Sequence, residues 1–256
     1  SATSATVTGL TNGSGYIFRV TARNAAGSGN ASLTSSSVVP RTVPSAVPSV
    51  TTTAGNTQVV LSWGLPVNTG GSAITDYVVE FSDDSGATWS TFADGVSTTR
   101  AATVSGLTNG TPYVFRVAAV NAAGTGTSSQ VTAAVTPFTT PGQPTAVSGT
   151  SGDAQVTVAW SAPSGNGGSA ITNYNVQYSS NAGGSWTLFT RSDSTALSTT
   201  VTGLTNGTAY VFRVAAVKAA GAGSYSSPSS AVTPMRVATA PTMSTVTPGD
   251  EQATIT

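Results

Sequence analysis

The chain has 256 residues, of which nine are Lys or Arg and nine are Asp or Glu. Charged residues make up only 7% of it, against roughly 25% in an ordinary soluble domain. It has no Cys and no His, which excludes a disulfide scaffold, a thiol nucleophile, an imidazole base and the usual transition-metal sites. The net charge of zero argues against nucleic acid as a partner, because that binding needs clustered basic residues. The apolar runs are far shorter than the ~20 residues of a membrane helix, so we expect no membrane insertion in this segment.

A repeat of 97 residues organises the sequence. The pentapeptide Gly-Leu-Thr-Asn-Gly begins at positions 9, 106 and 203, which are 97 residues apart. Aromatic residues and prolines obey the same spacing: Tyr16, Tyr113 and Tyr210; Trp63 and Trp160; Trp89 and Trp186; Pro40, Pro137 and Pro234. So many anchors held at one spacing predict a tandem array of modules.

Two complete modules are predicted, at residues 44–137 and 141–234. Residues 1–40 correspond to the C-terminal half of a module, and residues 241–256 correspond to the beginning of another. We therefore interpret the chain as a piece of a longer array.

Short linkers bounded by proline are predicted between the modules. Residues 40–44 and 137–141 each place three residues between two prolines. Because proline fixes its own φ and restricts the residue before it, these two linkers should be stiff. The linker between Pro234 and Pro241 holds six residues and should bend more.

Residues 44–137 divide into short apolar and β-branched runs separated by clusters of Gly, Asn, Ser and Pro. This alternation predicts an all-β fold with essentially no helix. The seven predicted strands are Val47–Thr53, Thr57–Trp63, Ile74–Ser82, Thr88–Phe92, Arg100–Ser105, Tyr113–Val120 and Gln130–Thr136. The two-residue period of the third and sixth strands places their alternate apolar residues on the buried face. These residues are Tyr77, Val79, Phe81, Tyr113, Phe115, Val117 and Ala119.

Trp63, late in the second predicted strand, resembles the core tryptophan of fibronectin type III domains, and residues 106–117 resemble the most recognisable stretch of that family. The resemblance covers essentially the whole chain. It implies tandem seven-stranded antiparallel β-sandwiches, arranged as beads on a rod, each with sheets of three and four strands. It also implies that Tyr113 forms the tyrosine corner of the sandwich. Modules so similar to one another resemble the arrays of large secreted and cell-surface bacterial proteins, or of phage virion proteins.

A few acidic residues raise the question of a calcium site. Asp83, Asp84 and Asp94 could supply the oxygen ligands that Ca²⁺ prefers. Residues 83–86 also stand where a hairpin turn is needed, and the next module has Asn and Ala at the positions of the acidic pair. Because a repeated metal site would keep its ligands, we favour a solvated turn.

Arginines recur at the outward position of the sixth strand, as Arg19, Arg116 and Arg213. They could form a line of cations for contact with a carbohydrate or a protein. The favoured interpretation is that each arginine lays its aliphatic stem over the sheet and keeps its charge in water.

Trp89 and Trp186 lie on the hairpin after the third strand of each module. An exposed tryptophan can stack on a sugar or anchor an interface. We favour packing, in which each tryptophan closes the sandwich edge next to Phe92 or Phe189.

Four asparagines satisfy the glycosylation pattern Asn-x-Ser/Thr: Asn12, Asn30, Asn109 and Asn206. Three of them lie in an Asn-Gly turn that the fold needs, so glycosylation is the minor interpretation. The chain has no Arg-Gly-Asp tripeptide, and its acidic residues are scattered, with no repeated pair that could act as acid and base. No catalytic, cofactor-binding or metal-binding residue is predicted, and the sequence names no ligand-binding residue.

The sequence therefore predicts a non-enzymatic structural array: a stalk, fibre, filament or sheath of an extracellular or cell-surface assembly. Other proteins or copies of the chain itself are the expected partners. Lateral association is a plausible extension because the single lysine leaves the sheet edges without the lysines that often guard them. The alternative is an adhesive or carbohydrate-binding accessory module of a secreted protein or of a phage virion protein, with a cell-surface polysaccharide as a partner.

Overall fold

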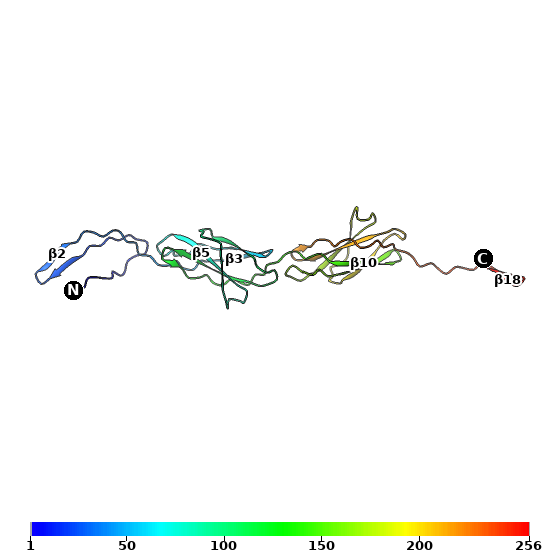
Figure 1. Cartoon of the computed structure of the whole chain (residues 1–256), viewed down its shortest axis with the longest axis horizontal. Helices are drawn as coiled ribbons and strands as arrows, with labels where there is room; N and C mark the ends of the chain where they lie inside the picture. The colour runs from blue at the N-terminus through cyan, green and yellow to red at the C-terminus, as the bar shows by residue number, and fades with distance from the viewer. Residues whose placement is uncertain (1, 256) are drawn as a thin grey trace. The chain divides into compact units, whose positions relative to one another are not determined.

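The computed structural model describes residues 2–255, so the first residue of the predicted N-terminal half-module and the last residue of the predicted C-terminal piece lie outside it. Within this range the chain forms eighteen β-strands and no helix (Figure 1). The chain divides into two compact units, with the boundary between residues 139 and 140. The fold is all-β, as the sequence predicts.

The first unit contains a sandwich of two antiparallel sheets, which we call the first sandwich. Its three-stranded sheet has the order β3 (Thr51–Gly55), β4 (Gln58–Ser62), β7 (Ala101–Ser105). Its four-stranded sheet has the order β6 (Ser90–Phe92), β5 (Ile74–Ser82), β8 (Val114–Asn121), β9 (Gly124–Thr125). Residues 2–43, the N-terminal segment, carry the hairpin of β1 (Thr21–Asn24) and β2 (Gly27–Ala31).

The second unit repeats this arrangement in a second sandwich. Its three-stranded sheet has the order β10 (Thr145–Gly152), β11 (Gln155–Ser161), β14 (Ser198–Thr202). Its four-stranded sheet has the order β13 (Thr187–Phe189), β12 (Asn173–Ser179), β15 (Val211–Lys218), β16 (Gly221–Ala222). The hairpin of β17 (Val246–Gly249) and β18 (Gln252–Ile255) follows, and all its described side chains are exposed.

Apolar side chains fill the space between the two sheets of each sandwich. In the first sandwich they include Val59, Leu61, Trp63, Tyr77, Val79, Val104, Phe115, Val117 and Ala119. Their counterparts 97 residues later form the core of the second sandwich. The Trp63 ring meets the Tyr77 ring edge-on, with centroids 5.3 Å apart, and Trp160 and Tyr174 are separated by the same distance. The predicted buried face is confirmed, with Phe81 half-buried against the core.

The predicted strand Gln130–Thr136 is wrong. Residues 126–135 run beside β8, but they pair with it at every third residue instead of every second. The amides of Gly126, Ser129, Thr132 and Val135 donate to the carbonyls of Ala119, Val117, Phe115 and Tyr113, over 2.8–3.0 Å. A regular strand pairs with a two-residue period, so only an isolated bridge between Tyr113 and Val135 remains.

Side-chain hydroxyls complete this irregular pairing. Ser129 Oγ accepts the amide of Val117 at 3.1 Å, and Thr132 Oγ1 accepts the amide of Phe115 at 3.0 Å. The same bonds occur in the second sandwich and in the N-terminal segment. We call the six residues that accept them the hydroxyl ladder: Ser32, Ser35, Ser129, Thr132, Ser226 and Ser229.

The N-terminal segment keeps these local bonds without a closed core. Val20 occupies the position of Val117 and is 73% exposed, whereas Val117 is fully buried. Residues 2–43 contain no counterparts of β3–β5, which cover Val117 in the first sandwich. The hydrogen bonds of the repeat therefore form along the chain even where its apolar residues are uncovered.

Candidate functional site

The outer face of the four-stranded sheet carries the recurring arginine. Arg116 Nε donates to Glu80 Oε2 at 2.7 Å across the pair β5–β8, and the guanidinium lies 4.2 Å from the ring centroid of Trp89. Both charged side chains are partly exposed. The arginine points outward, as predicted, and it packs on the sheet and on an aromatic ring.

The second sandwich repeats this stack with a neutral partner. Arg213 Nε donates to Gln177 Oε1 at 2.8 Å, in the same register across β12–β15. Its guanidinium lies 4.2 Å from the ring centroid of Trp186 and 4.4 Å from that of Tyr225. The stack therefore survives the loss of the acidic partner.

Trp89 and Trp186 pack against the protein, as predicted, but the predicted place at the sandwich edge next to Phe92 and Phe189 is wrong. Register places Phe92 opposite Val79, on the core side, whereas Trp89 lies with Arg116 on the other side of the same sheet. Both tryptophans are half-buried. An arginine therefore covers one face of each ring and keeps that face from stacking on a sugar.

Asp84 is one of the acids considered for calcium, but both of its carboxylate oxygens accept hydrogen bonds within its own hairpin turn. Its Oδ1 accepts the Ser82 hydroxyl at 2.6 Å and the Thr88 amide at 2.9 Å, and its Oδ2 accepts the Thr88 hydroxyl at 2.7 Å. The hydrogen bonds from Ser82 and then Thr88 hold the pKa of Asp84 well below its usual range. In the second sandwich Asn181 Oδ1 accepts the corresponding bonds from Ser179 and Ser185. This position therefore caps a hairpin in both sandwiches.

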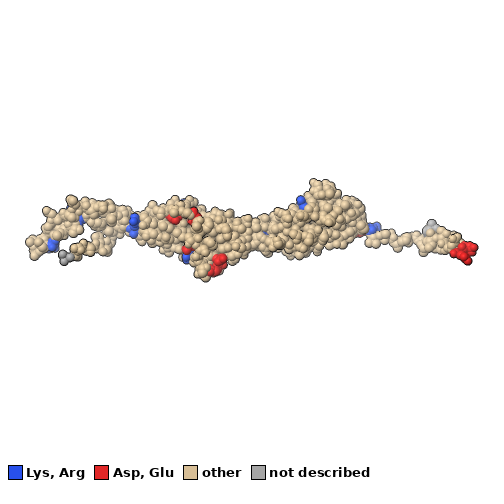
Figure 2. All heavy atoms as spheres, in the orientation of Figure 1, with Lys and Arg blue, Asp and Glu red and all other residues tan. Residues whose placement is uncertain are grey.

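Charges are sparse and separated on the molecular surface. Figure 2 shows basic and acidic atoms as isolated spots on a surface made of other residues. In the part of the chain that the structure describes, no three His, Cys, Asp or Glu side chains come together as a group that could hold a metal ion.

The Asn-Gly turns are tied to the neighbouring sheet. Asn109 Oδ1 accepts the Thr57 amide at 2.9 Å, and its Nδ2, the atom that would carry a glycan, donates to Asn56 Oδ1 at 2.8 Å. Tyr113 fixes the same turn, because its hydroxyl accepts the Thr108 amide at 3.1 Å. Equivalent tyrosine bonds occur at Tyr16 and Tyr210, so the tyrosine corner is confirmed in all three copies.

The glycine-rich loop after β4 forms a joint with the linker of residues 40–44. The Thr42 amide donates to the Gly70 carbonyl at 2.9 Å, and the Ser45 amide donates to the Asn68 carbonyl at 2.8 Å. A Cβ at Gly71 would collide with the backbone of Gly13, in the Asn-Gly turn of the N-terminal segment. Sequence reasoning missed this joint because it brings together residues far apart in the chain.

Asn121, at the end of β8, ties the joint together. Its Nδ2 donates to the Thr42 carbonyl at 2.8 Å and to the Thr69 carbonyl at 2.7 Å. Its Oδ1 accepts the Ala123 amide at 2.7 Å. The side chain is only 4% exposed, so its polar groups are satisfied by these protein partners and not by solvent.

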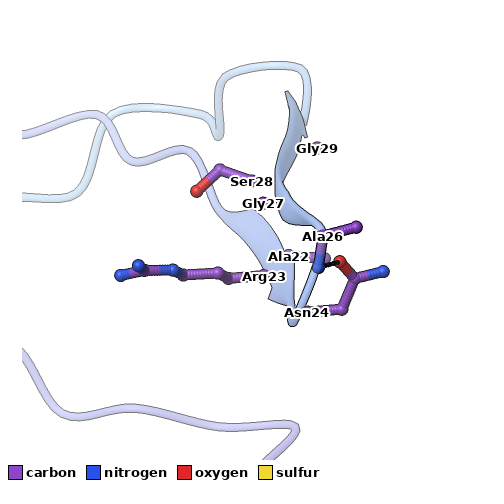
Figure 3. Close-up of a pocket in the computed structure, with 7 residues that line it drawn as sticks. All are labelled: Ala22, Arg23, Asn24, Ala26, Gly27, Ser28 and Gly29. Carbon is purple, nitrogen blue, oxygen red and sulfur yellow. Dashed lines mark hydrogen bonds between the residues drawn. The ribbon is translucent and has the colours of Figure 1, made fainter.

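The hairpin β1–β2 shows the same residues without a linker over them. Asn24 holds the repeat position of Asn121, and its Oδ1 accepts the Ala26 amide at 2.9 Å. Figure 3 shows Asn24 at the rim of a shallow pocket, with its amide nitrogen directed away from the hairpin. Gly27 and Gly29 line this pocket.

Lys218 holds the same repeat position in the second sandwich. It is 3% exposed, and its Nζ donates to the Gly167 carbonyl at 2.7 Å, in the glycine-rich loop of that sandwich. Burial lowers the pKa of the Lys218 ammonium from its ordinary value, because desolvation penalises the charged form.

Comparison with known protein families gives one match for each of the two sandwiches. The sequence model of the fibronectin type III domain matches residues 44–135 and 140–232, well over half of the chain. The chain belongs to the fibronectin type III domain family.

Fibronectin type III relatives of this chain occur in animals and in a bacterium. Myomesin-2 from Homo sapiens is 32% identical over 259 residues, covering 97% of this chain and 18% of that protein. Fibronectin type-III domain-containing protein 3a from Gallus gallus is 31% identical over 227 residues, covering 86% and 18%. Exoglucanase B from Cellulomonas fimi is 38% identical over 146 residues, covering 54% and 12%. The chain therefore spans less than a fifth of the length of each of these relatives. Because most of them are animal proteins, they do not show the predicted resemblance to bacterial surface arrays in particular.

Among solved structures, the chicken CNTN1 FN1–FN3 domains align with 89% of this chain and 78% of that chain, at 21% identity and a TM-score of 0.41. Nowhere in residues 2–255 does this fibronectin type III chain form a helix long and apolar enough to cross a lipid bilayer.

Proposed function

We propose that this chain is a non-enzymatic spacer array in an extracellular or cell-surface assembly. Its units are the modules 44–137 and 141–234, and proteins or further copies of the chain are its partners. The joint within residues 2–139 supports this proposal. There Thr42 of the linker is hydrogen-bonded to Gly70, Ser45 directly after the linker is hydrogen-bonded to Asn68, and Gly71 packs directly on Gly13. A linker held in this way fixes the spacing between consecutive modules.

Small-angle scattering of arrays of increasing length tests the spacer function. We expect the maximum dimension to grow by a constant ~25–30 Å per added module, from strands of about eight residues at 3.3 Å rise. A dimension that stops growing as modules are added would contradict the proposal. Sedimentation at increasing concentration tests lateral association separately, and a strictly monomeric array would remove self-assembly while keeping the spacer.

A carbohydrate-binding accessory module is the second candidate. It is favoured by the tryptophans on the outer face of each sandwich and by the similarity to a protein named exoglucanase B. A screen against cell-surface and plant polysaccharides separates the two functions. Binding that is lost in Trp89→Ala, Trp186→Ala would support this candidate, and absence of binding would leave the spacer.

A further inference from the structure

We propose that the side chain at the repeat position of Asn24, Asn121 and Lys218 is a binding site for the proline-bounded linker ahead of each module. This inference rests on the spacer function proposed above and names the residue that sets the stiffness of the joint. The occupant is an extended segment that ends in proline and offers carbonyl oxygens, as Thr42-Val43-Pro44 does.

The hydrogen bonds of Asn121 identify the occupant. One amide group reaches the linker at the Thr42 carbonyl and the glycine-rich loop at the Thr69 carbonyl. A side-chain amide has two N–H donors, so both are used. Because Asn121 is buried, removing it leaves two carbonyls of the joint without their donor, and a buried unpaired polar group is costly.

The hairpin after Asn121 is shaped to let the linker approach. A Cβ at Gly126 would collide with the Pro44 carbonyl oxygen, and a Cβ at Gly124 would lie 3.7 Å from Val43 Cγ1. In the second sandwich a Cβ at Gly223 would collide with the Pro141 carbonyl in the same way. A glycine at this position admits the backbone of a proline, which has a carbonyl acceptor and no N–H donor.

The hairpin β1–β2 carries the same residues, and the described part of the chain places no linker beside them. In the hairpin β1–β2, Asn24, Gly27 and Gly29 take the places of the residues that hold the linker in the first sandwich (Figure 3). A Cβ at Gly27 would meet nothing within 4 Å. Asn24 keeps its bond to the Ala26 amide, which matches the bond of Asn121 to the Ala123 amide. The local turn thus forms without the linker, and the amide donors of this asparagine are what the linker engages.

Lysine at position 218 changes the chemistry of the site. Its ammonium donates, here to the Gly167 carbonyl, but it has no acceptor for the amide two residues later, which Asn121 does accept. The side chain at this position therefore bonds to the glycine-rich loop in both sandwiches, and asparagine is the form that also fixes its own turn.

Amide exchange in the full chain tests the site, with Asn24 as an internal control. In the unaltered chain we expect the side-chain amide of Asn121 to exchange at least about tenfold more slowly than that of Asn24, because only Asn121 is buried and bonded to two carbonyls. Asn121→Ala should accelerate exchange of the Thr42 backbone amide about tenfold. The matched change Asn24→Ala removes the same residue from the same hairpin and should leave Thr42 unchanged.

The backbone amide of Phe115, deep in the first sandwich, reports global unfolding. Equal acceleration of Thr42 and Phe115 in Asn121→Ala would show that the asparagine acts on the whole sandwich, and would overturn the proposal. Unchanged exchange at Thr42 would overturn it too. Asn121→Lys, which copies the second sandwich, should keep Phe115 protected and give Thr42 an intermediate rate. These outcomes are independent of array length, so a failure here leaves the scattering test of the spacer function intact.

Discussion

The two sandwiches make the same hydrogen bonds with different charges. Acidic and amide side chains are exchanged between them at four positions: Asn56 and Asp153, Asp76 and Asn173, Glu80 and Gln177, Asp84 and Asn181. In each pair a side-chain oxygen accepts a hydrogen bond from the same repeat position of its own sandwich. In the order of the four pairs, the donors are Asn109 and Asn206, Ser97 and Ser194, Arg116 and Arg213, and Thr88 and Ser185. These positions require an acceptor oxygen and tolerate either charge state. The four acids in these pairs, Asp76, Glu80, Asp84 and Asp153, are therefore parts of turns and strand pairs, which supports a structural role.

The largest effect is expected where the two sandwiches agree. Ser129→Ala and Ser226→Ala each remove the hydroxyl that accepts a buried β8 or β15 amide. Each should lower the free energy of unfolding of its own sandwich by about 1–3 kcal/mol, because the amide is left unpaired. Urea unfolding followed by resolved NMR signals measures the two losses. The control Ser128→Ala, at the adjacent half-buried serine, should cost less, and equal costs for Ser128 and Ser129 would refute the role of the hydroxyl ladder.

A smaller effect is expected in acid, where the stability of the first sandwich should depend on the pH through Asp84 and that of the second should not depend on Asn181. The pKa of Asp84 is lowered in the folded state, so its contribution to stability is complete above the unfolded pKa of about 4. That contribution is lost as the pH falls below this value toward the folded pKa, because the unfolded state then binds the proton more readily. Asn181 does not titrate. We therefore expect Asp84→Asn to flatten the pH dependence of the first sandwich between pH 5 and pH 2. An unchanged pH profile in this variant would contradict the assignment.

The smallest effect concerns the ion pair on the outer face. Glu80→Gln copies the second sandwich and removes the charge from a partly exposed pair. The free energy of unfolding should fall by about 0.5 kcal/mol at low salt and by almost nothing in 1 M salt, where the charges are screened. Gln177→Glu in the second sandwich should produce the opposite change. Losses that do not depend on salt would show that packing on Trp89, and not charge, decides this position.

Much of the fold could be predicted from the sequence because it depends on a short-range period. The strand predicted at Ile74–Ser82 is β5, with the same bounds, because alternating apolar residues and a Gly-containing turn define it locally. Ser85 and Gly86 adopt positive φ in that turn, as its composition indicates. The 97-residue spacing then transfers these assignments to the second sandwich.

The wrong strand prediction and the joint that was not predicted have different physical causes. The strand predicted at Gln130–Thr136 assumes a two-residue period, although Ser129, Thr132 and Val135 are spaced every third residue, and so are their counterparts 97 residues later. That signal was present in the sequence. The joint at Gly70 and Gly71 could not be predicted from the local sequence. A glycine that packs against a distant backbone has the same local sequence as a glycine in a flexible loop. Its recurrence as Gly167 and Gly168 was the only hint.

The three-residue period of the hydroxyl ladder has a consequence for folding in a tandem array. Near-identical neighbouring modules hold copies of the same strands at high local concentration, and an unpaired strand edge can capture the wrong copy. Residues 126–135 cover the edge of β8. Their amides bond to its carbonyls, and the hydroxyls of Ser129 and Thr132 accept its amides, so these groups of β8 are not available to a strand of another module. In a chain with a single lysine, hydroxyl groups therefore protect this edge from mispairing where proteins more often use charge.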